Sequence, residues 1–232
     1  YSNRHRSFLQ ACAAHGTLSQ TQAMKILNSV NGNVLDDESL TVEDLHTVIN
    51  EINRQINPFD QEIKFIRHDI LNKTFIVFSH TSESNINKFQ SAYTEHERNY
   101  FRIILKEIAC TEGYFINPIV ALNATQELKV KNFSKNRAEQ LLDEWCDLGY
   151  LVNKDNNIYF GPKIIADFSN NLKVNFPDSI VDCQLCKMIV FWGVECDQCD
   201  AKFHRECMKK FVRRVLKCAA CDAPWNTRLS QD

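Results

Sequence analysis

The chain has 232 residues, of which 44% are hydrophobic and 24% charged, a composition typical of one large domain or of two to three small ones. Its formal net charge of −2 gives no global electrostatic reason to expect nucleic-acid binding. No apolar run approaches the roughly 20 residues that a membrane-spanning helix needs, and the start, Tyr1 to Arg4, shows no secretory signal. We therefore expect a protein that neither crosses a membrane nor is secreted.

The chain is predicted to begin with three helices. Apolar residues at helical spacing predict helices over 3–14 and 19–28, and a loop-like stretch follows at 28–39. The third helix starts after Thr41, a hydroxyl cap that is followed three residues later by the acid Asp44, as in a capping box. Its apolar face consists of Leu45, Val48, Ile49, Ile52 and Ile56.

A β-hairpin is predicted to follow the third helix. Pro58 ends that helix, and two segments rich in Ile, Phe and Val, at 62–69 and 74–80, flank the polar break Asn72-Lys73. Three helices followed by a two-stranded hairpin is the element order of a winged-helix domain. We assign the first such domain to residues 1–81.

The same order of elements is predicted after a polar linker at 82–92. A second capping-box sequence opens a helix at Thr94. A short strand at 114–116 precedes Pro118, which suits the first turn of the next helix, and Ser134 caps a third. The apolar faces of the first and third of these helices are Tyr100, Phe101, Ile104, Leu105 and Ile108, and Ala138, Leu141, Leu142, Trp145 and Leu148.

A second hairpin and one more helix complete this part. Gly149 stands where a left-handed helix terminator belongs. The segments 150–152 and 158–160 flank a turn of Asp and Asn residues, and a final helix is predicted over 162–171. We assign a second winged-helix domain to residues 93–178, so the predicted fold class is α+β.

Seven of the ten cysteines lie between 183 and 221. An odd number, three C-x-x-C pairs and an interposed histidine favour metal binding in a reducing compartment over disulfides. The spacing C-x2-C-x9-C-x2-C-x4-H-x2-C-x10-C-x2-C supplies eight ligands for two closed, structural zinc sites, which we assign to a zinc-binding domain at 179–232. The candidate ligands are Cys183, Cys186, Cys196, Cys199, His204, Cys207, Cys218 and Cys221.

The other cysteines and histidines indicate no further site. Cys12, Cys110 and Cys146 lie on or beside apolar helix faces, where core packing explains them. No Cys–His–acid constellation indicates nucleophilic catalysis, and we assign no catalytic residue. The histidines left without a functional role are His5, His15, His46, His68, His80 and His96.

The whole chain resembles a known family. Two tandem winged helices followed by a variant RING of C4HC3 order, with a PHD-like ligand sequence, are similar to the RING-bearing non-SMC element subunit of the SMC five–six genome-maintenance complex. The resemblance is carried by Gly149 to Val152 and by 183–225, including Phe203-His204 and Pro224-Trp225. It implies interleaved ligands, with one zinc on Cys183, Cys186, His204 and Cys207 and the other on Cys196, Cys199, Cys218 and Cys221.

The resemblance also implies a function. By this resemblance, the chain is expected to be a nuclear, chromosome-associated ubiquitin ligase of DNA repair and recombination, which works with a MAGE-type winged-helix subunit and a kleisin subunit. A RING ligase positions a charged ubiquitin-conjugating enzyme, and here Leu185 and Phe211 stand where RING modules present apolar contacts to it. Ala219 and Asp222 replace the proline and the basic residue that many active RINGs carry, so activity is expected to be weak alone and partner-dependent.

Two alternatives stay open at this point. The chain could be a non-enzymatic scaffold whose zinc module only docks partners, or a PHD-like chromatin reader, although Leu216 replaces an aromatic residue usual in histone readers. The basic run at 202–217 is explained by the negative charge that zinc–thiolate sites retain. Acidic third helices disfavour DNA binding by the winged helices. An auxiliary DNA contact is assigned to the edge Lys129, Lys131, Lys135 and Arg137.

Overall fold

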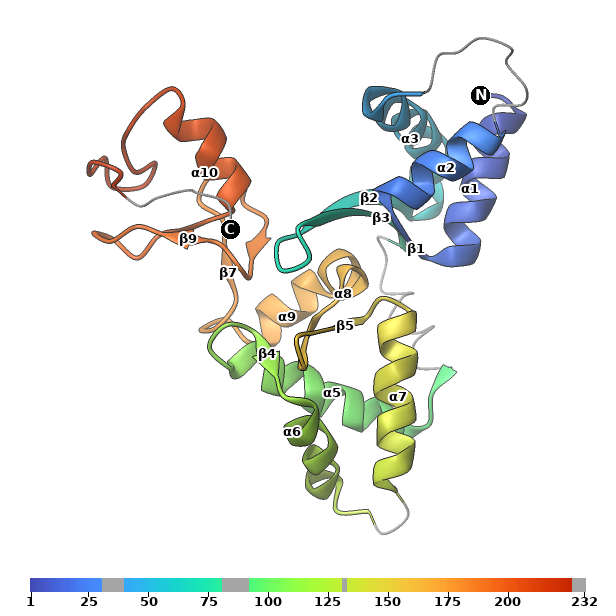
Figure 1. Cartoon of the computed structure of the whole chain (residues 1–232), viewed down its shortest axis with the longest axis vertical. Coiled ribbons are helices and arrows are strands. Elements are labelled where there is room, and N and C mark those ends of the chain that lie inside the picture. Colours follow the sequence, from blue (N-terminus) through green and yellow to red (C-terminus); the bar gives the residue numbers. More distant parts are fainter. Residues whose placement is uncertain (31–39, 81–91, 131–132, 227–232) are drawn as a thin grey trace.

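The computed structural model describes residues 1–30, 40–80, 92–130 and 133–226. The predicted loop at 28–39 and linker at 82–92 lie almost entirely outside these ranges. The described helices and strands form three groups along the chain (Figure 1), and each group encloses most of one hydrophobic cluster. None of the described helices is long and apolar enough to cross a lipid bilayer.

Three helices and a three-stranded antiparallel sheet enclose the first cluster. The strand order is β1-β3-β2, and β2 and β3 form the predicted hairpin. The sequence did not predict β1, because three residues are too few to show the alternation that identifies a strand. The elements are α1 (Asn3–His15), β1 (Thr17–Ser19), α2 (Gln20–Val30), α3 (Val42–Ile56), the 3-10 turn η1 (Asn57–Phe59), β2 (Gln61–His68) and β3 (Lys73–His80).

Helix α3 confirms the predicted cap and apolar face. The Thr41 Oγ1 accepts a hydrogen bond from the Asp44 N–H at 3.3 Å, and Asp44 Oδ2 accepts one from the Thr41 N–H at 2.8 Å. These bonds satisfy N–H groups that the start of a helix leaves unpaired. All five residues of the predicted face are at most 5% exposed, so the helix is held to the first cluster along its length.

A second group of helices and a second three-stranded sheet enclose the largest cluster, in the lower half of Figure 1. The strand order is β4-β6-β5, and the β5–β6 turn places Asp155 and Asn156 at φ 52° and 59°, as a type I′ turn requires. The elements are α5 (Glu95–Cys110), β4 (Phe115–Ile116), α6 (Pro118–Asn123), η2 (Ala124–Leu128), α7 (Lys135–Asp147), β5 (Leu151–Lys154), β6 (Asn157–Phe160), α8 (Pro162–Asp167) and α9 (Ser169–Asn175).

Two details of this region differ from the prediction. Leu148, expected on the buried face of α7, is 42% exposed, because the helix has already ended and the chain turns at Gly149 with φ 77°. The single helix expected after the second hairpin is interrupted at Phe168. There the ring packs into the cluster, with centroids 6.2 Å from those of Phe101 and Tyr150.

The three isolated cysteines divide between core and surface. Cys12 is buried and Cys146 packs against the second cluster, as predicted, and burial raises the pKa of their thiols to about 12 and about 11. Cys110 is exposed, which corrects the expectation of core packing. It is the last residue of α5, one position beyond the buried Ala109.

Four short strands and one helix form the third region. Strand β7 pairs with β8 and β9 pairs with β10, both antiparallel. Three of the seven buried residues in its cluster are cysteines, so the apolar core of this region is small. The elements are β7 (Val181–Asp182), β8 (Ile189–Val190), β9 (Val194–Glu195), β10 (Lys202–Phe203) and α10 (Arg205–Val212).

The second and third clusters meet at β8. Ile189 and Phe191 belong to the second cluster, whereas Val190 between them belongs to the third. The Phe191 ring centroid lies 5.0 Å from that of Phe160 and 5.4 Å from that of Tyr114. The third region is therefore packed against the second through one side of its first hairpin.

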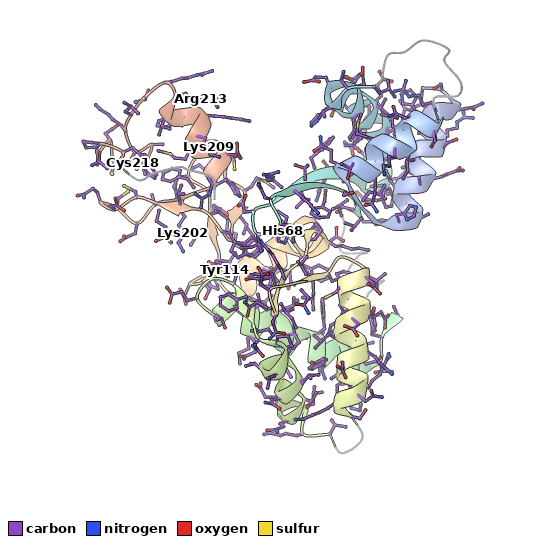
Figure 2. The ribbon with its side chains drawn as sticks, in the orientation of Figure 1. His68, Tyr114, Lys202, Lys209, Arg213 and Cys218 are labelled. Carbon is purple, nitrogen blue, oxygen red and sulfur yellow. The ribbon has the colours of Figure 1, made fainter. Side chains whose placement is uncertain are left out.

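The tip of the β2–β3 hairpin brings all three regions together at His68, labelled in Figure 2. This side chain is fully buried, with Nε2 2.8 Å from the Phe160 carbonyl and its ring centroid 4.9 Å from the Trp192 ring. Nearby, Lys154 Nζ donates to the Ile70 carbonyl at 2.9 Å. No local sequence pattern predicts a role for His68, because its partners are distant in the chain.

Candidate metal centre

Eight cysteine and histidine side chains of the third region form two groups of four. Within each group all the candidate ligand atoms lie within 4.8 Å of one another. The groups alternate along the chain, in the interleaved order that the resemblance implied. The first group is Cys183, Cys186, His204 and Cys207, and the second is Cys196, Cys199, Cys218 and Cys221.

The three C-x-x-C pairs adopt the same turn. The residue after the second cysteine has a left-handed backbone, with φ 61° at Lys187, 54° at Asp200 and 57° at Asp222. The N–H of that residue donates to the carbonyl of the first cysteine of its pair, at 2.8, 3.0 and 3.1 Å respectively. Such a turn directs both sulfurs toward one point, which is what a shared metal ion needs.

His204 is oriented as a metal ligand in the first group. Its Nδ1 lies 3.2 Å from Cys186 Sγ and 3.9 Å from Cys207 Sγ, while its Nε2 lies 2.9 Å from the Ile189 carbonyl. A carbonyl can only accept, so Nε2 carries the proton and the Nδ1 lone pair points to the sulfurs. Ile189 thus fixes the tautomer, a role that no motif in the sequence indicates.

The sulfur spacing of the second group fits zinc. The Sγ atoms of Cys196 and Cys221 are 3.8 Å apart, as are those of Cys199 and Cys218. A disulfide would need about 2.05 Å. Tetrahedral zinc with bonds of about 2.3 Å separates its sulfur ligands by about 3.8 Å. The two donor sets, one of three sulfurs and a nitrogen and one of four sulfurs, are compatible with two structural zinc ions.

One cysteine in each group has a lowered thiol pKa, which favours its thiolate form. Burial opposes the ionisation of Cys183 and Cys218, but backbone N–H groups outweigh it and lower the pKa of each thiol to about 7. The donors include the His204 N–H, 3.3 Å from Cys183 Sγ, and the Ala220 N–H, 3.3 Å from Cys218 Sγ. A lowered pKa favours the metal-binding form.

A groove of about 490 Å³ adjoins the first group. Leu185, from the loop between the first two ligands, and Phe211, from α10, both line it. The two apolar residues named from the sequence therefore lie at one surface, and both pack against the third cluster. Three cations, Lys210, Arg213 and Arg214, line the same groove.

Part of the basic run is paired within the third region. Lys202 Nζ lies 2.9 Å from Glu195 Oε1, and Lys209 Nζ lies 3.1 Å from Glu206 Oε1. Both pairs are partly exposed, where an ion pair contributes little to stability. They nevertheless show local neutralisation of these two cations.

The edge named for an auxiliary DNA contact is also partly engaged within the chain. Arg137 Nη2 lies 2.6 Å from Glu97 Oε1, and Lys135 Nζ donates to Asn123 Oδ1 at 2.8 Å. Lys131 lies outside the described residues. The arrangement gives no added support to a DNA-binding surface there.

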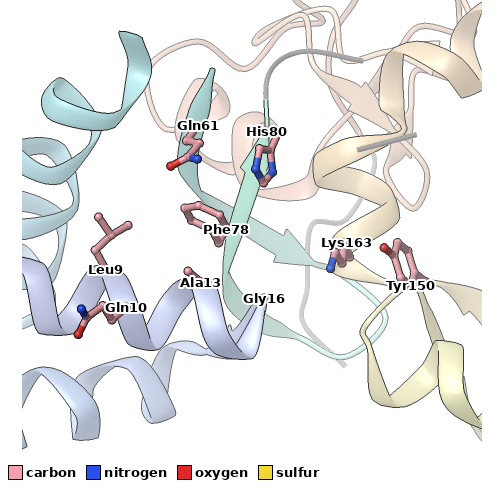
Figure 3. A pocket seen from close by; sticks show the side chains of 9 residues that line it. All are labelled: Leu9, Gln10, Ala13, Gly16, Gln61, Phe78, His80, Tyr150 and Lys163. Carbon is pink, nitrogen blue, oxygen red and sulfur yellow. The ribbon is translucent and has the colours of Figure 1, made fainter. Parts of the chain in front are cut away.

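A second hollow, of about 530 Å³, lies between the first and second regions (Figure 3). Figure 3 shows α1 and β3 on one side of it and Tyr150 and Lys163 on the other. Lys163 Nζ stands 4.8 Å from the Tyr150 ring centroid. The lining residues are Leu9, Gln10, Ala13, Gly16, Gln61, Phe78, His80, Tyr150 and Lys163.

Two interleaved four-ligand groups on short hairpins and one helix define the third region as a RING-like module, and a profile described as a RING-like domain matches residues 183–221. A profile described as Nse1, a non-SMC component of the SMC5-6 complex, matches residues 5–129, more than half of the chain. The chain therefore belongs to the Nse1 family.

Full-length relatives agree with this assignment. A Drosophila melanogaster protein called non-structural maintenance of chromosomes element 1 homolog is 29% identical over 228 residues, covering 96% of this chain and 95% of that protein. Mus musculus and Homo sapiens proteins of the same name are 25% identical over 223 residues, covering 95% of this chain and 83% of each. A chain in a solved Nse1-Nse3-Nse4 complex has the same fold, with a TM-score of 0.77, 21% identity and 98% of both chains covered.

Proposed function

We propose that this protein is the RING-bearing subunit of a nuclear SMC5-6-type complex that maintains and repairs chromosomes, and that it acts as an E3 ubiquitin ligase. Family membership supports the place in the complex. The ligase activity rests on one observation: Leu185 and Phe211 line the same groove beside the first metal group. The eight residues of the two groups are the proposed zinc ligands.

The groove is proposed to bind a ubiquitin-conjugating enzyme. Zinc at the first group would fix the Cys183–Cys186 turn and the start of α10, and with them the positions of Leu185 and Phe211. A ligase of this type adds no reacting group of its own. It lowers the barrier by holding the charged enzyme and its ubiquitin in an attack-ready arrangement.

The first two regions are proposed to be winged-helix domains that bind partner subunits. Each has helices followed by a hairpin within a three-stranded sheet. Because a structural relative was solved in a complex with Nse3 and Nse4, we assign a MAGE-type winged-helix partner and a kleisin partner to this chain. The hollow between the two regions offers apolar Leu9 and Phe78 beside Lys163, a suitable surface for an amphipathic helix of the first partner (Figure 3).

A single-turnover discharge assay tests the ligase activity. The zinc-loaded chain, with its MAGE-type partner, is mixed with a ubiquitin-charged conjugating enzyme and free lysine. Leu185→Ala should slow discharge about tenfold, equivalent to about 1.4 kcal/mol of lost positioning energy. Leu216→Ala is the matched control, because Leu216 is a 74% exposed leucine of the same module that does not line the groove. Zinc content should be unchanged in both variants.

A scaffold without ligase activity is the alternative that a specific observation favours. Asp222 stands where many active RINGs carry a basic residue that orients ubiquitin, and it occupies the left-handed position of the third C-x-x-C turn. An acid cannot donate the hydrogen bonds of an arginine. If the wild-type complex discharges no faster than a His204→Ala complex, while Leu185→Ala still binds its partners, the scaffold is the correct function.

A further inference from the structure

The outer edge of β2 presents unpaired backbone groups. Successive residues of an antiparallel strand direct their N–H and C=O groups alternately to either side. Those of Ile63 point away from β3 and bond to the side chain of Asn53, at 2.8 and 2.9 Å. The same alternation directs the groups of Phe65 and Arg67 outward, and no group in the described part of the chain bonds to them.

A slot of about 250 Å³ adjoins this edge, between the β2–β3 hairpin and the start of α10. Most of its non-ligand lining is apolar, and Met188 is 62% exposed. Cys186, His204 and Cys207 also line the slot, so its shape depends on the first metal group. The apolar side chains are Phe65, Ile66, Ile165, Met188 and Ile189.

The charges at the slot do not suit a nucleic-acid strand. It is lined by two carboxylates, Asp69 and Glu206, and by one guanidinium, Arg67. Arg67 is hydrogen-bonded to Asn72, within its own hairpin, and Glu206 is paired with Lys209. Without an excess of cations there is no counterion release to offset the repulsion of phosphates. An uncharged polypeptide backbone meets no such penalty.

We propose that the outer edge of β2 is a docking site for an extended segment of a partner protein. The segment adds to the sheet beside β2, exchanges backbone hydrogen bonds with Phe65 and Arg67, and places an aliphatic side chain in the slot. Backbone pairing supplies affinity and the slot supplies sequence preference, as in other cases of strand addition. Because first-group ligands line the slot, docking also requires the zinc-loaded module.

Two pairs of variants of the full, zinc-loaded chain isolate these contributions. Arg67→Pro removes the outward N–H, and it leaves the ladder to β3 intact because that N–H does not face β3. Arg67→Ala is its control, since it loses the same side chain but keeps the N–H. Met188→Glu places a charge in the slot at an exposed position. Met188→Leu, which conserves volume, is the control for it.

The probe is a displayed library of random peptides of about twelve residues, selected on the wild-type protein. Enriched peptides should alternate apolar and polar residues. Fluorescence anisotropy should show affinities about tenfold weaker for Arg67→Pro and for Met188→Glu, but within about twofold for the two controls. Hydrogen exchange of the Phe65 and Arg67 amides should slow when peptide is added.

Three outcomes would overturn the proposal. One is a selection that enriches no peptide, or only peptides that bind Arg67→Pro and Met188→Glu as tightly as the wild type. Another is concentration-dependent self-association that Arg67→Pro abolishes, which would make a second copy the occupant. The third is duplex DNA binding that Met188→Glu weakens while Met188→Leu does not. If Arg67→Pro fails to fold, the Met188 pair decides alone.

Discussion

The two metal groups have nearly the same donors but different surroundings. The first is tied to the rest of the protein, because the Ile189 carbonyl that orients His204 belongs to a strand packed into the second cluster. In the second group, Cys196 and Cys218 belong to the third cluster and Cys199 and Cys221 are exposed, and Figure 2 shows Cys218 on the side of the module remote from His68 and Tyr114. We therefore expect the first group to stabilise the whole chain and the second to stabilise only its own module.

The largest difference is expected when each group loses one ligand. His204→Ala should remove one zinc ion and lower the stability of the whole chain by about 3 kcal/mol or more, because β8 then loses its anchor beside the second cluster. Cys221→Ser should also remove one zinc ion but leave the main unfolding transition in place. Metal analysis and calorimetry of both variants measure this. Equal shifts of the main transition would contradict the expected difference between the two metal groups.

The tryptophans of the module provide a smaller contrast. Trp192 Nε1 donates to the Gly113 carbonyl at 2.9 Å and its ring lies beside His68. Trp192→Ala should therefore cost about 2 to 3 kcal/mol. Trp225 makes an edge contact with Phe203 inside the third cluster, and Trp225→Ala should cost about 1 kcal/mol. Chemical denaturation measures both values. The reverse order would contradict the placement of Trp192 where the three regions meet.

The contact between the three regions at His68 is also expected to make the stability of the protein depend on pH. Burial lowers the pKa of His68 below its ordinary value of 6.5, although the Phe160 carbonyl partly opposes this. The neutral ring therefore contributes stability that is complete above pH 6.5 and is lost as the pH falls below it through the folded-state pKa. Lys154, which faces the same turn, adds to the penalty for protonation.

His68→Gln isolates this titration from that of the zinc ligands, since it keeps an N–H donor for the Phe160 carbonyl. Unfolding free energies measured between pH 7.5 and 5.5 should fall less steeply for His68→Gln than for the wild type. Parallel curves would contradict this, because they would mean that the pKa of His68 is the same in the folded and the unfolded protein.

The smallest effect is expected at the periphery. Leu216 is 74% exposed beside the second group, and Leu216→Ser should change the unfolding free energy by less than about 0.5 kcal/mol. Urea titration at constant zinc concentration measures this change. A decrease of more than about 1 kcal/mol in the unfolding free energy would show that Leu216 is more tightly packed than its exposure indicates.

Local signals explain what the sequence could predict. The Thr41 and Thr94 capping boxes and the turn at Asp155 and Asn156 depend on residues close in the chain, and all three are present. Ligand spacing likewise predicted eight ligands for two sites, because each C-x-x-C turn is complete within five residues, whereas their interleaved division into two groups was implied by the family resemblance.

The features that the sequence did not predict depend on distant partners. His68 looked ordinary because Phe160 and Trp192 are far away in the chain. The predicted final helix is interrupted at Phe168, whose ring packs against Phe101, and no local pattern encodes this contact. β1 is recognisable only through its pairing with β3, and the exposure of Cys110 depends on where α5 ends relative to its cluster.

Native-state hydrogen exchange tests the comparison of the two metal groups most directly. Amides of β5 and β6, in the second region, are followed in the wild type, His204→Ala and Cys221→Ser at constant zinc. We predict that these amides exchange much faster in His204→Ala and at the wild-type rate in Cys221→Ser, while amides near each altered ligand lose protection in both variants. Equal protection of β5 and β6 in the two variants would contradict it.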